Sequence, residues 1–247
     1  MNKRNYQKEL DRLLVRLQEE GAITEETAPT LLLHSCCAPC SSYTLEYLSR
    51  YFRITVLYFN PNIMRKEEYE KRVAEQQRLI EEIRPPLTPP QGEDFMPLKG
   101  EDQNQSQGQS LSGFSPPPRG GVGGGLSFVA GRYEPREFVE AVKGLEHEPE
   151  GGARCRVCYR LRLEEAVKIA KEGGYDFFCT TLSISPLKHA DWLNEIGEEL
   201  AEQYGVSWLP SDFKKKGGYK RSIELSKEHN LYRQNFCGCE YSKNNKN

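Results

Sequence analysis

The sequence has no long hydrophobic run and no excess of positive charge. No stretch approaches the roughly 18 consecutive apolar residues of a membrane-spanning helix. Residues 1–14 are charged throughout and lack the apolar centre of a secretory signal. The 34 lysines and arginines are outnumbered by 36 aspartates and glutamates, so overall charge gives no sign of a nucleic-acid-binding protein. We therefore expect a cytoplasmic protein that does not contact a membrane.

Cysteine, in contrast, is abundant and clustered. Seven of the eight cysteines form three groups along the chain: Cys36, Cys37 and Cys40; Cys155 and Cys158; Cys237 and Cys239. Because cytosolic thiols are kept reduced, metal ligation or catalysis explains such groups better than structural disulfides do. The eighth, Cys179, lies in an apolar segment, and we expect it to be a small buried hydrophobe.

Hydrophobic periodicity predicts alternating strands and helices. Short apolar runs predict strands at 30–34, 54–59, 176–182 and 206–209. Helical spacing predicts helices at 5–20, 66–83, 135–145, 161–171, 192–204 and 220–229, and a further helix capped by Ser41 or Ser42. The strand–helix alternation favours a parallel sheet. We expect one α/β domain over residues 1–247, with a Rossmann-like parallel sheet flanked by helices.

Residues 85–127 interrupt this pattern. They hold eight of the 15 prolines and nine of the 21 glycines. Their few apolar side chains cannot offset a backbone-ordering cost of ~1–2 kcal/mol per residue, so we expect a disordered, low-complexity insertion. It should lie inside one domain, because the cysteines on its two sides are expected to form one site.

Four of the clustered cysteines make a full ligand set for tetrahedral zinc or for an iron–sulfur cluster: Cys36, Cys37, Cys155 and Cys158. The last two fall at a predicted helix start, where free N–H groups and the helix dipole favour thiolate. Adjacent cysteines are awkward ligands for one small zinc ion, which favours iron–sulfur, with structural zinc as the alternative. Cys40 is left to supplement the set or to bind a second metal.

Cys237-Gly238-Cys239 has a different character. Two thiols one residue apart can close only a very small disulfide ring, whose strain makes it easy to reduce. The glycine lowers the steric cost of the tight backbone. A switchable dithiol fits these facts, and a pair of metal ligands or of chance thiols is the alternative.

A basic loop precedes the last predicted helix. The cations around its Gly217-Gly218-Tyr219 are Lys214, Lys215, Lys216, Lys220 and Arg221. Basic groups beside an aromatic ring and flexible glycines suit phosphate and base contacts. The loop therefore suggests nucleic-acid binding, with an ordinary solvated surface as the alternative.

Six stretches of the chain resemble the QueH family of epoxyqueuosine reductases. They are Leu33-His34-Ser35-Cys36-Cys37-Ala38-Pro39-Cys40, Phe59-Asn60-Pro61-Asn62-Ile63, Gly151-Gly152-Ala153-Arg154-Cys155-Arg156-Val157-Cys158, Thr180-Thr181-Leu182-Ser183-Ile184-Ser185-Pro186, Asp212-Phe213-Lys214-Lys215 and Leu231-Tyr232-Arg233-Gln234-Asn235-Phe236-Cys237-Gly238-Cys239. They follow in order over nearly the whole chain. The family pattern has a short connection where residues 85–127 stand here.

The resemblance implies a cobalamin-independent enzyme that removes the epoxide oxygen from epoxyqueuosine at the wobble position of tRNA, using two electrons and two protons. It implies an adenine-nucleotide-hydrolase-like sheet. The quartet Cys36, Cys37, Cys155 and Cys158 would hold a [4Fe–4S] cluster, with room for an additional iron. Cys237 and Cys239 would form a redox-active disulfide, which requires an electron donor.

The resemblance also implies a tRNA-binding surface on the basic loop. The residues expected there are Asp212, Lys214, Lys215, Tyr219, Lys220 and Arg221. Asp212 and Tyr219 are also candidates for the acid that protonates the leaving alkoxide.

Two other functions remain open. One is ATP-dependent tRNA thiolation, but thiols fill the slot after the first strand where such enzymes carry a Ser-Gly-Gly-x-Asp-Ser phosphate loop. The other is a non-catalytic RNA-binding module stapled by zinc, in which Cys237 and Cys239 would be dispensable.

Overall fold

A single parallel sheet organises the protein. The computed structural model describes residues 4–19, 27–83 and 125–242. Over these ranges the sheet order is β3-β2-β1-β4-β5, and every neighbouring pair is parallel. The strands are β1 (Thr30–His34), β2 (Arg53–Tyr58), β3 (Leu126–Ala130), β4 (Phe177–Thr180) and β5 (Ser207–Trp208). The expected Rossmann-like α/β fold is confirmed.

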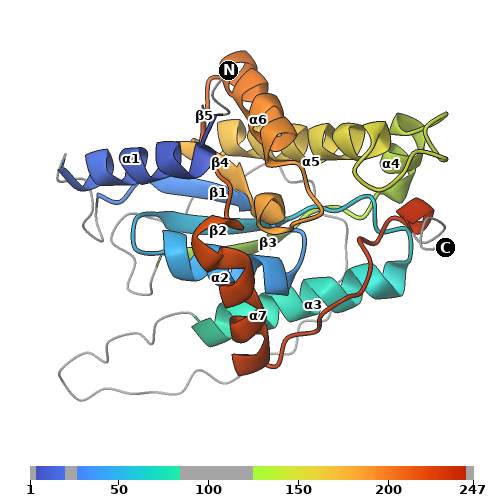
Figure 1. The fold of residues 1–247 in the computed structure, drawn as a ribbon, viewed down its shortest axis with the longest axis horizontal. Helices are drawn as coiled ribbons and strands as arrows, with labels where there is room; N and C mark the ends of the chain where they lie inside the picture. The colour runs from blue at the N-terminus through green and yellow to red at the C-terminus, as the bar shows by residue number, and fades with distance from the viewer. Residues whose placement is uncertain (1–3, 20–26, 84–124, 243–247) are drawn as a thin grey trace.

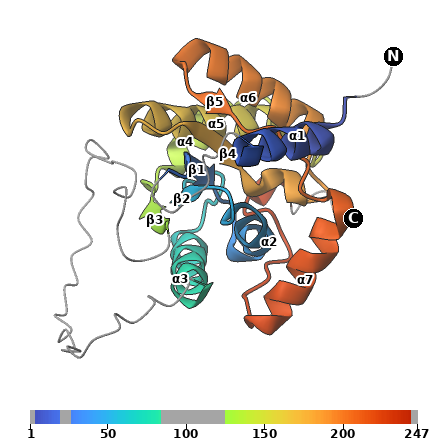
Figure 2. The ribbon, with the colours of Figure 1, turned by 90° about the vertical axis from the view of Figure 1, so that its left-hand side faces the viewer.

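Helices cover both faces of this sheet. They are α1 (Tyr6–Glu19), α2 (Ala38–Leu48), α3 (Lys66–Ile83), α4 (Pro135–Ala141), α5 (Ala153–Glu172), α6 (Ala190–Tyr204) and α7 (Gly218–Glu228). Figures 1 and 2 show α5 and α6 on one face and α2 and α3 on the other, with α7 packed outside α2. All residues of β1 and β2 are buried, as a sheet covered on both faces requires. None of the helices in the described ranges is long and apolar enough to cross a membrane.

The strand order reverses between β1 and β4, and the chain leaves their carboxyl ends in opposite directions along the sheet. Such a switch point is where ligands bind in open α/β sheets. His34 ends β1 and is in register with Thr180, which ends β4. The His34 ring lies 2.8 Å from Thr180 Oγ1 and 3.0 Å from the carbonyl oxygen of Phe59, just after β2. Burial lowers the pKa of His34 to about 4, so the ring is neutral. Its two contacts link the carboxyl ends of β1, β2 and β4, two residues before the first cysteine.

The predicted C-terminal bound of the insertion, residue 127, was wrong. Its last two residues, Leu126 and Ser127, belong to β3, a strand missing from the predicted elements. β3 lies at the sheet edge beside β2, and only two of its five residues, Leu126 and Val129, are buried. Such a short, half-exposed run after a glycine-rich stretch gives little hydrophobic signal. The rest of the predicted insertion, through residue 124, lies outside the described residues.

The helix starts that carry the cysteines also differ from expectation. Helix α2 begins at Ala38, not after Ser41 or Ser42, because Cys37 is extended and Pro39 stands in the first turn. Helix α5 begins at Ala153, well before the predicted residue 161. Both helices therefore start on the carboxyl side of the sheet with cysteines in their first turns.

Candidate metal and thiol site

Three cysteine sulfurs meet at the start of α2; we call Cys36, Cys37 and Cys40 the trio. Cys37 Sγ lies 3.9 Å from the sulfur of Cys36 and 2.8 Å from that of Cys40. All three sulfurs lie within 4.8 Å of one another. The Thr181 hydroxyl, just past β4, is 3.6 Å from Cys36 Sγ, so the trio lies at the β1/β4 switch point. Thiols at this spacing can contribute ligands to a thiophilic metal.

The crowding of the trio separates the pKa values of its thiols. Hydrogen bonds from Cys37 and Cys40 hold the pKa of Cys36 well below its usual range. Burial raises the pKa of Cys37, and the neighbouring sulfurs raise that of Cys40. The three groups therefore cannot all ionise together unless a cation joins them, which is what a bound metal provides.

The trio lines one cavity, and the other four clustered cysteines line a second. Cys155 and Cys158 come from the first turns of α5, and they face Cys237 and Cys239 from the C-terminal segment. The Cys155 sulfur accepts a hydrogen bond from the backbone N–H of Gly151 at 3.2 Å. Burial raises the pKa of Cys158 to about 12 and also raises the pKa of Cys239.

The two cavities share walls. Four residues line both of them: Glu150, Arg162, Lys188 and Cys237. The guanidinium of Arg162 on α5 is fully buried and interacts electrostatically with the sulfurs of Cys158, Cys237 and Cys36. All seven clustered cysteines thus belong to one continuous site at the carboxyl edge of the sheet.

Within the described residues, the cysteines brought to mutual ligand distance are the trio and not the predicted quartet. The quartet of Cys36, Cys37, Cys155 and Cys158 stays a prediction. Cys40 was predicted only to supplement the quartet or to bind a second metal, but it is one of the three cysteines at mutual ligand distance. The signal was present in the sequence, because Cys37 and Cys40 are three residues apart and flank the proline of a helical first turn.

Adjacency of two cysteines does not by itself exclude zinc. A tetrahedral zinc ion with Zn–S bonds of about 2.3 Å places its ligand sulfurs about 3.8 Å apart. The Cys36–Cys37 separation of 3.9 Å matches that edge, whereas the 2.8 Å between Cys37 and Cys40 would have to widen. The spacing of the trio alone therefore does not separate zinc from an iron–sulfur cluster.

The C-terminal dithiol is held by α3 and by the loop after β2. The buried guanidinium of Arg72 donates to the carbonyl oxygen of Cys237 at 3.3 Å, and Asn62 Nδ2 lies 3.3 Å from the same oxygen and 3.8 Å from its sulfur. Gly238 has a φ of +101°, and a Cβ there would meet Ile63 at 2.7 Å. The glycine is therefore required between the two cysteines. Both thiols are free in this structure, so the disulfide stays a prediction.

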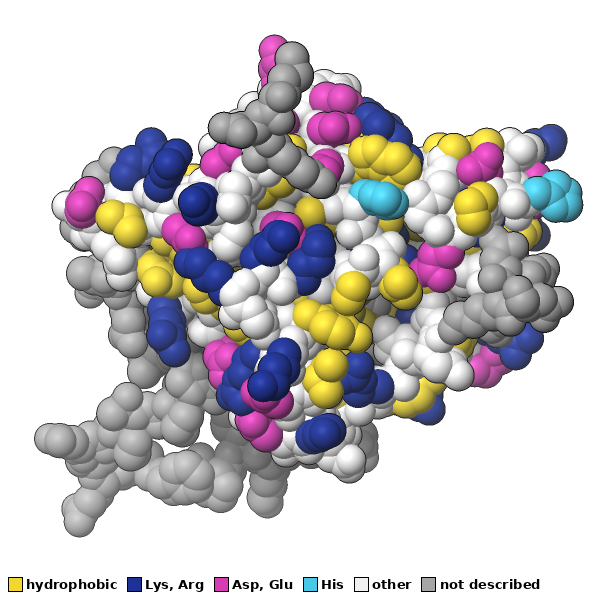
Figure 3. Space-filling view, in the orientation of Figure 1, with side chains coloured by type: hydrophobic (Ala, Val, Ile, Leu, Met, Phe, Trp, Pro, Cys, Tyr) yellow, Lys and Arg dark blue, Asp and Glu magenta, His cyan; other side chains and the backbone are white. Residues whose placement is uncertain are grey.

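Acidic partners neutralise much of the basic loop. Lys214 pairs with Asp212, and Lys216 pairs with Asp11 of α1 at 2.6 Å. Lys215 is exposed and has no ion-pair partner among the described residues. Figure 3 shows lysine and arginine side chains gathered over α7 and the segment before it, with acidic side chains between them. The local excess of positive charge is therefore smaller than the sequence suggested.

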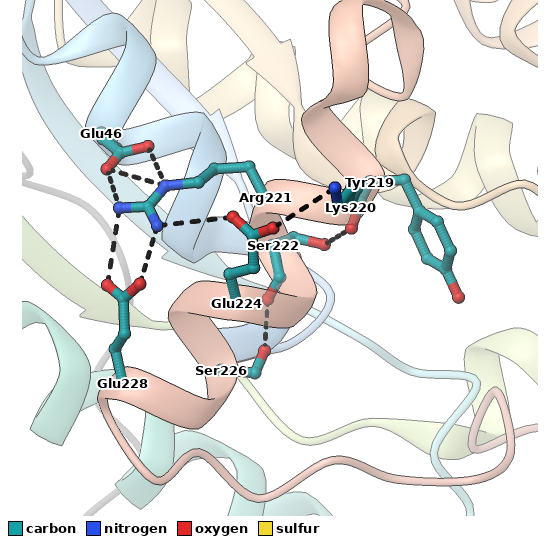
Figure 4. Close-up of polar contacts among 8 residues, drawn as sticks. All are labelled: Glu46, Tyr219, Lys220, Arg221, Ser222, Glu224, Ser226 and Glu228. Atoms are coloured by element: carbon teal, nitrogen blue, oxygen red, sulfur yellow. Dashed lines mark hydrogen bonds and ion pairs between the residues drawn. The ribbon is translucent and has the colours of Figure 1, made fainter.

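Arg221 is held inside the protein's own ion-pair network. Its guanidinium lies 2.7 Å from Glu46 of α2 and 2.7 Å from Glu228 at the end of α7 (Figure 4). Tyr219 points away from this network (Figure 4), is 39% exposed and lines the cavity of the trio. Arg233 also lines that cavity, is exposed and has no carboxylate partner within the described ranges. The sequence reasoning missed Arg233 because it stands apart from the basic run.

Together, the fold and site define a Rossmann-like α/β protein with a cluster of cysteines, spaced as metal ligands can be, at the switch point of its sheet. The family model described as "Epoxyqueuosine reductase QueH" matches residues 31–107 and 122–245 of the chain. The chain therefore belongs to the QueH family, as its motifs suggested.

Curated relatives agree with this family. The chain is similar to "Epoxyqueuosine reductase QueH" of Staphylococcus epidermidis, with 37% identity over 240 residues, 96% of this chain and 84% of the relative. The Streptococcus pyogenes serotype M1 protein of the same name is 38% identical, covering 88% of this chain and 72% of the relative. The Thermotoga maritima protein of that name is 30% identical, covering 86% and 90%. These names support an oxidoreductase over the thiolation and zinc-module alternatives.

Proposed function

We propose that this protein converts epoxyqueuosine to queuosine at the wobble position of tRNA. Both C–O bonds of the epoxide break, a C=C bond forms, and the oxygen leaves as water after taking up two electrons and two protons. Membership of the QueH family over nearly the whole chain carries the proposal. The seven cysteines gathered at the switch point support it, because this reaction needs a source of electrons and no other group in the site is as readily oxidised.

We propose that Cys36, Cys37, Cys155 and Cys158 hold a [4Fe–4S] cluster, with Cys40 as a further ligand or the ligand of an additional iron. Buried Arg162 supports an anionic sulfur centre here. Its hydrogen bonds go to neutral acceptors, the carbonyl of Cys158 and the amide oxygen of Asn60. A buried guanidinium needs compensating negative charge, which thiolates bound to a metal centre would provide. Such a cluster supplies single electrons and an iron that can act as a Lewis acid.

Cys237 and Cys239 are proposed as the two-electron store of the site. Oxidation of the dithiol to the disulfide releases two electrons and two protons, which is what reduction of the epoxide consumes. The turn around Gly238 holds both sulfurs on the wall of the second cavity, next to Cys155 and Cys158. An electron donor must then reduce the disulfide before the next turnover.

The tRNA is proposed to reach the site over the rim of the cavity that the trio lines. Tyr219 offers a ring for stacking against a base, and Arg233 offers a cation for phosphates. Lys215, exposed in the basic loop, offers a second cation. Lys214, Lys220 and Arg221 would have to exchange carboxylate partners for phosphates. Of the two candidate proton donors, Tyr219 is better placed, because Asp212 is engaged by Lys214 and lines neither cavity.

One assay tests the proposal directly. Protein purified without oxygen should be brown and contain about four iron and four sulfide per chain. After reduction it is incubated with tRNA that carries epoxyqueuosine, and the nucleosides are analysed by mass. We expect conversion of epoxyqueuosine to a product lighter by one oxygen atom. Colourless protein with stoichiometric zinc and unchanged nucleoside would reject the proposal, and ATP turnover that depends on tRNA would favour the thiolation alternative.

Arg233 should contribute to tRNA binding. Replacing it with alanine should weaken binding about fivefold to tenfold and reduce the dependence of log Kd on log salt concentration by about 0.7–1, because one phosphate contact is lost. Fluorescence anisotropy of labelled tRNA at several salt concentrations measures both quantities. Lys168→Ala is the matched control, since Lys168 pairs with Glu164 far along α5. An Arg233→Ala protein with native affinity and salt dependence would remove this residue from the tRNA-binding surface.

A further inference from the structure

Gln76 is a fully buried glutamine on α3, on the side of that helix that packs against α2. Glutamine is mostly an exposed residue in proteins. The Gln76 amide nitrogen, Nε2, is buried and has no hydrogen-bond partner among the described residues. A buried donor without a partner destabilises a fold, so stability does not explain a glutamine at this position. No role for Gln76 follows from the sequence motifs.

The amide oxygen of Gln76, in contrast, contacts the two serines that flank the cysteine loop. It accepts hydrogen bonds from Ser35 Oγ at 2.6 Å and from Ser41 Oγ at 2.8 Å. Ser35 directly precedes Cys36, and Ser41 directly follows Cys40. One oxygen atom on another helix therefore links the two ends of the segment that carries the trio.

Both serines are also fixed to the surrounding backbone. The N–H of Ser35 donates to the carbonyl oxygen of Leu57 in β2 at 2.8 Å, and its own carbonyl accepts from Asn60 Nδ2 at 2.8 Å. The Ser41 hydroxyl lies 3.0 Å from the carbonyl oxygen of Cys37, to which the Ser41 N–H also donates at 3.1 Å. One serine is thus tied to the sheet and the other to the first turn of α2. The α3 amide is what joins them.

We propose that Gln76 is a positioning residue for the metal ligands Cys36 and Cys37. By holding Ser35 and Ser41 together, it fixes the path of the cysteine loop, so that the sulfurs stay at ligand spacing. Cys36 and Cys37 belong both to the trio and to the proposed quartet, so the role is the same whichever set binds the metal. The inference rests on the proposed function only in requiring that these cysteines bind a metal.

The expected effect of losing the amide is on the loop and not on the core. A leucine at position 76 is of similar size and keeps the packing between α3 and α2, but it offers no acceptor to the two buried hydroxyls. The ends of the loop then lose their link, and the cysteine sulfurs are held less firmly around the metal. The same substitution removes the unpaired Nε2, which limits its cost to the fold.

The test measures how fast metal leaves the full-length protein, purified without oxygen and with its metal bound. An excess of a chromogenic chelator that binds both iron and zinc takes up the released metal, and its absorbance gives the rate. Gln76→Leu should release metal about tenfold faster or more, the scale of effect when a group that holds a metal ligand in place is removed. A Ser35→Ala, Ser41→Ala double variant should show a similar rate.

Combining these variants tests whether Gln76 acts through the two serines. A protein with all three substitutions should release metal no faster than Gln76→Leu alone, because each change removes the same link. Ser41→Ala alone should also speed the release, by a smaller factor. Alanine is the better helix former, so this variant removes one hydrogen bond without weakening α2, and a faster release cannot then come from a less stable helix.

Gln77→Leu is the matched control. Gln77 is the next residue of α3, but it is exposed and its amide contacts Glu81, so its loss should leave the release rate unchanged. The inference is overturned if Gln76→Leu releases metal at the rate of the unmodified protein, even with a lowered unfolding temperature. It is equally overturned if the separate effects multiply in the triple variant. Because the chelator detects either metal and no tRNA is used, this outcome is distinguishable from failure of the reductase assay.

Discussion

Replacing Cys237 with serine should lower turnover of epoxyqueuosine-containing tRNA by at least about 10³-fold, the scale of effect seen when a reacting side chain is removed. A serine hydroxyl cannot be oxidised to a disulfide, so the two electrons of the pair are lost. The iron content should stay near four per chain, because Cys237 is not among the proposed cluster ligands. Nucleoside mass analysis of single and multiple turnovers, together with iron determination, measures both results.

Cys179→Ser is the matched control for this experiment. Cys179 lies in β4 and is fully buried, and its sulfur contacts the carbonyl of Leu209 and the hydroxyl of Ser211. Burial raises its pKa to about 12, as expected for an inert structural thiol. The variant should retain activity. If a Cys237→Ser, Cys239→Ser double variant also retained full activity, the dithiol would have no place in the reaction, as the zinc-module alternative predicts.

Replacing Cys37 with serine should remove most of the bound iron and the brown colour. Cys37 is the central sulfur of the trio, and its side chain is buried. A serine oxygen is a poor ligand for iron–sulfur clusters, which are held by thiolates. We expect less than about half of the native iron per chain and loss of epoxyqueuosine reduction. Metal analysis and visible absorbance of anaerobically purified protein are the measurements.

Two further variants decide which cysteines form the ligand set. If the quartet binds the cluster, Cys155→Ser should lose iron as severely as Cys37→Ser, and Cys40→Ser should keep the four irons of the cluster and lose at most an additional iron. The reverse order, with iron retained in Cys155→Ser and lost in Cys40→Ser, would move the metal to the trio at the start of α2. Stoichiometric zinc in the unmodified protein would replace the iron–sulfur assignment altogether.

Much of the fold could be predicted because its signals are local. The helix predicted over 66–83 has the bounds of α3, and the buried strand predicted over 30–34 has the bounds of β1. Both are long or strongly apolar for their type. The edge strand β3 escaped prediction because only two of its residues face the core. The early starts of α2 and α5 were not predicted because the extended backbone at Cys37 and Gly152, and not side-chain periodicity, marks where these helices begin.

The cysteines and their grouping were determined by the sequence alone, as was the parallel α/β class. Each of these depends on residue type and on spacing over a few positions. Only the tertiary structure decided which charged side chains surround the sulfurs. The charged residues that line the two cavities come from separate parts of the sequence: Arg72, Glu150, Arg162, Lys188 and Arg233. They reach the cysteines because strand order and helix packing bring distant segments to one sheet edge. It also neutralised much of the basic loop, since the charge of a side chain can be read from the sequence but its ion-pair partner is set by the fold.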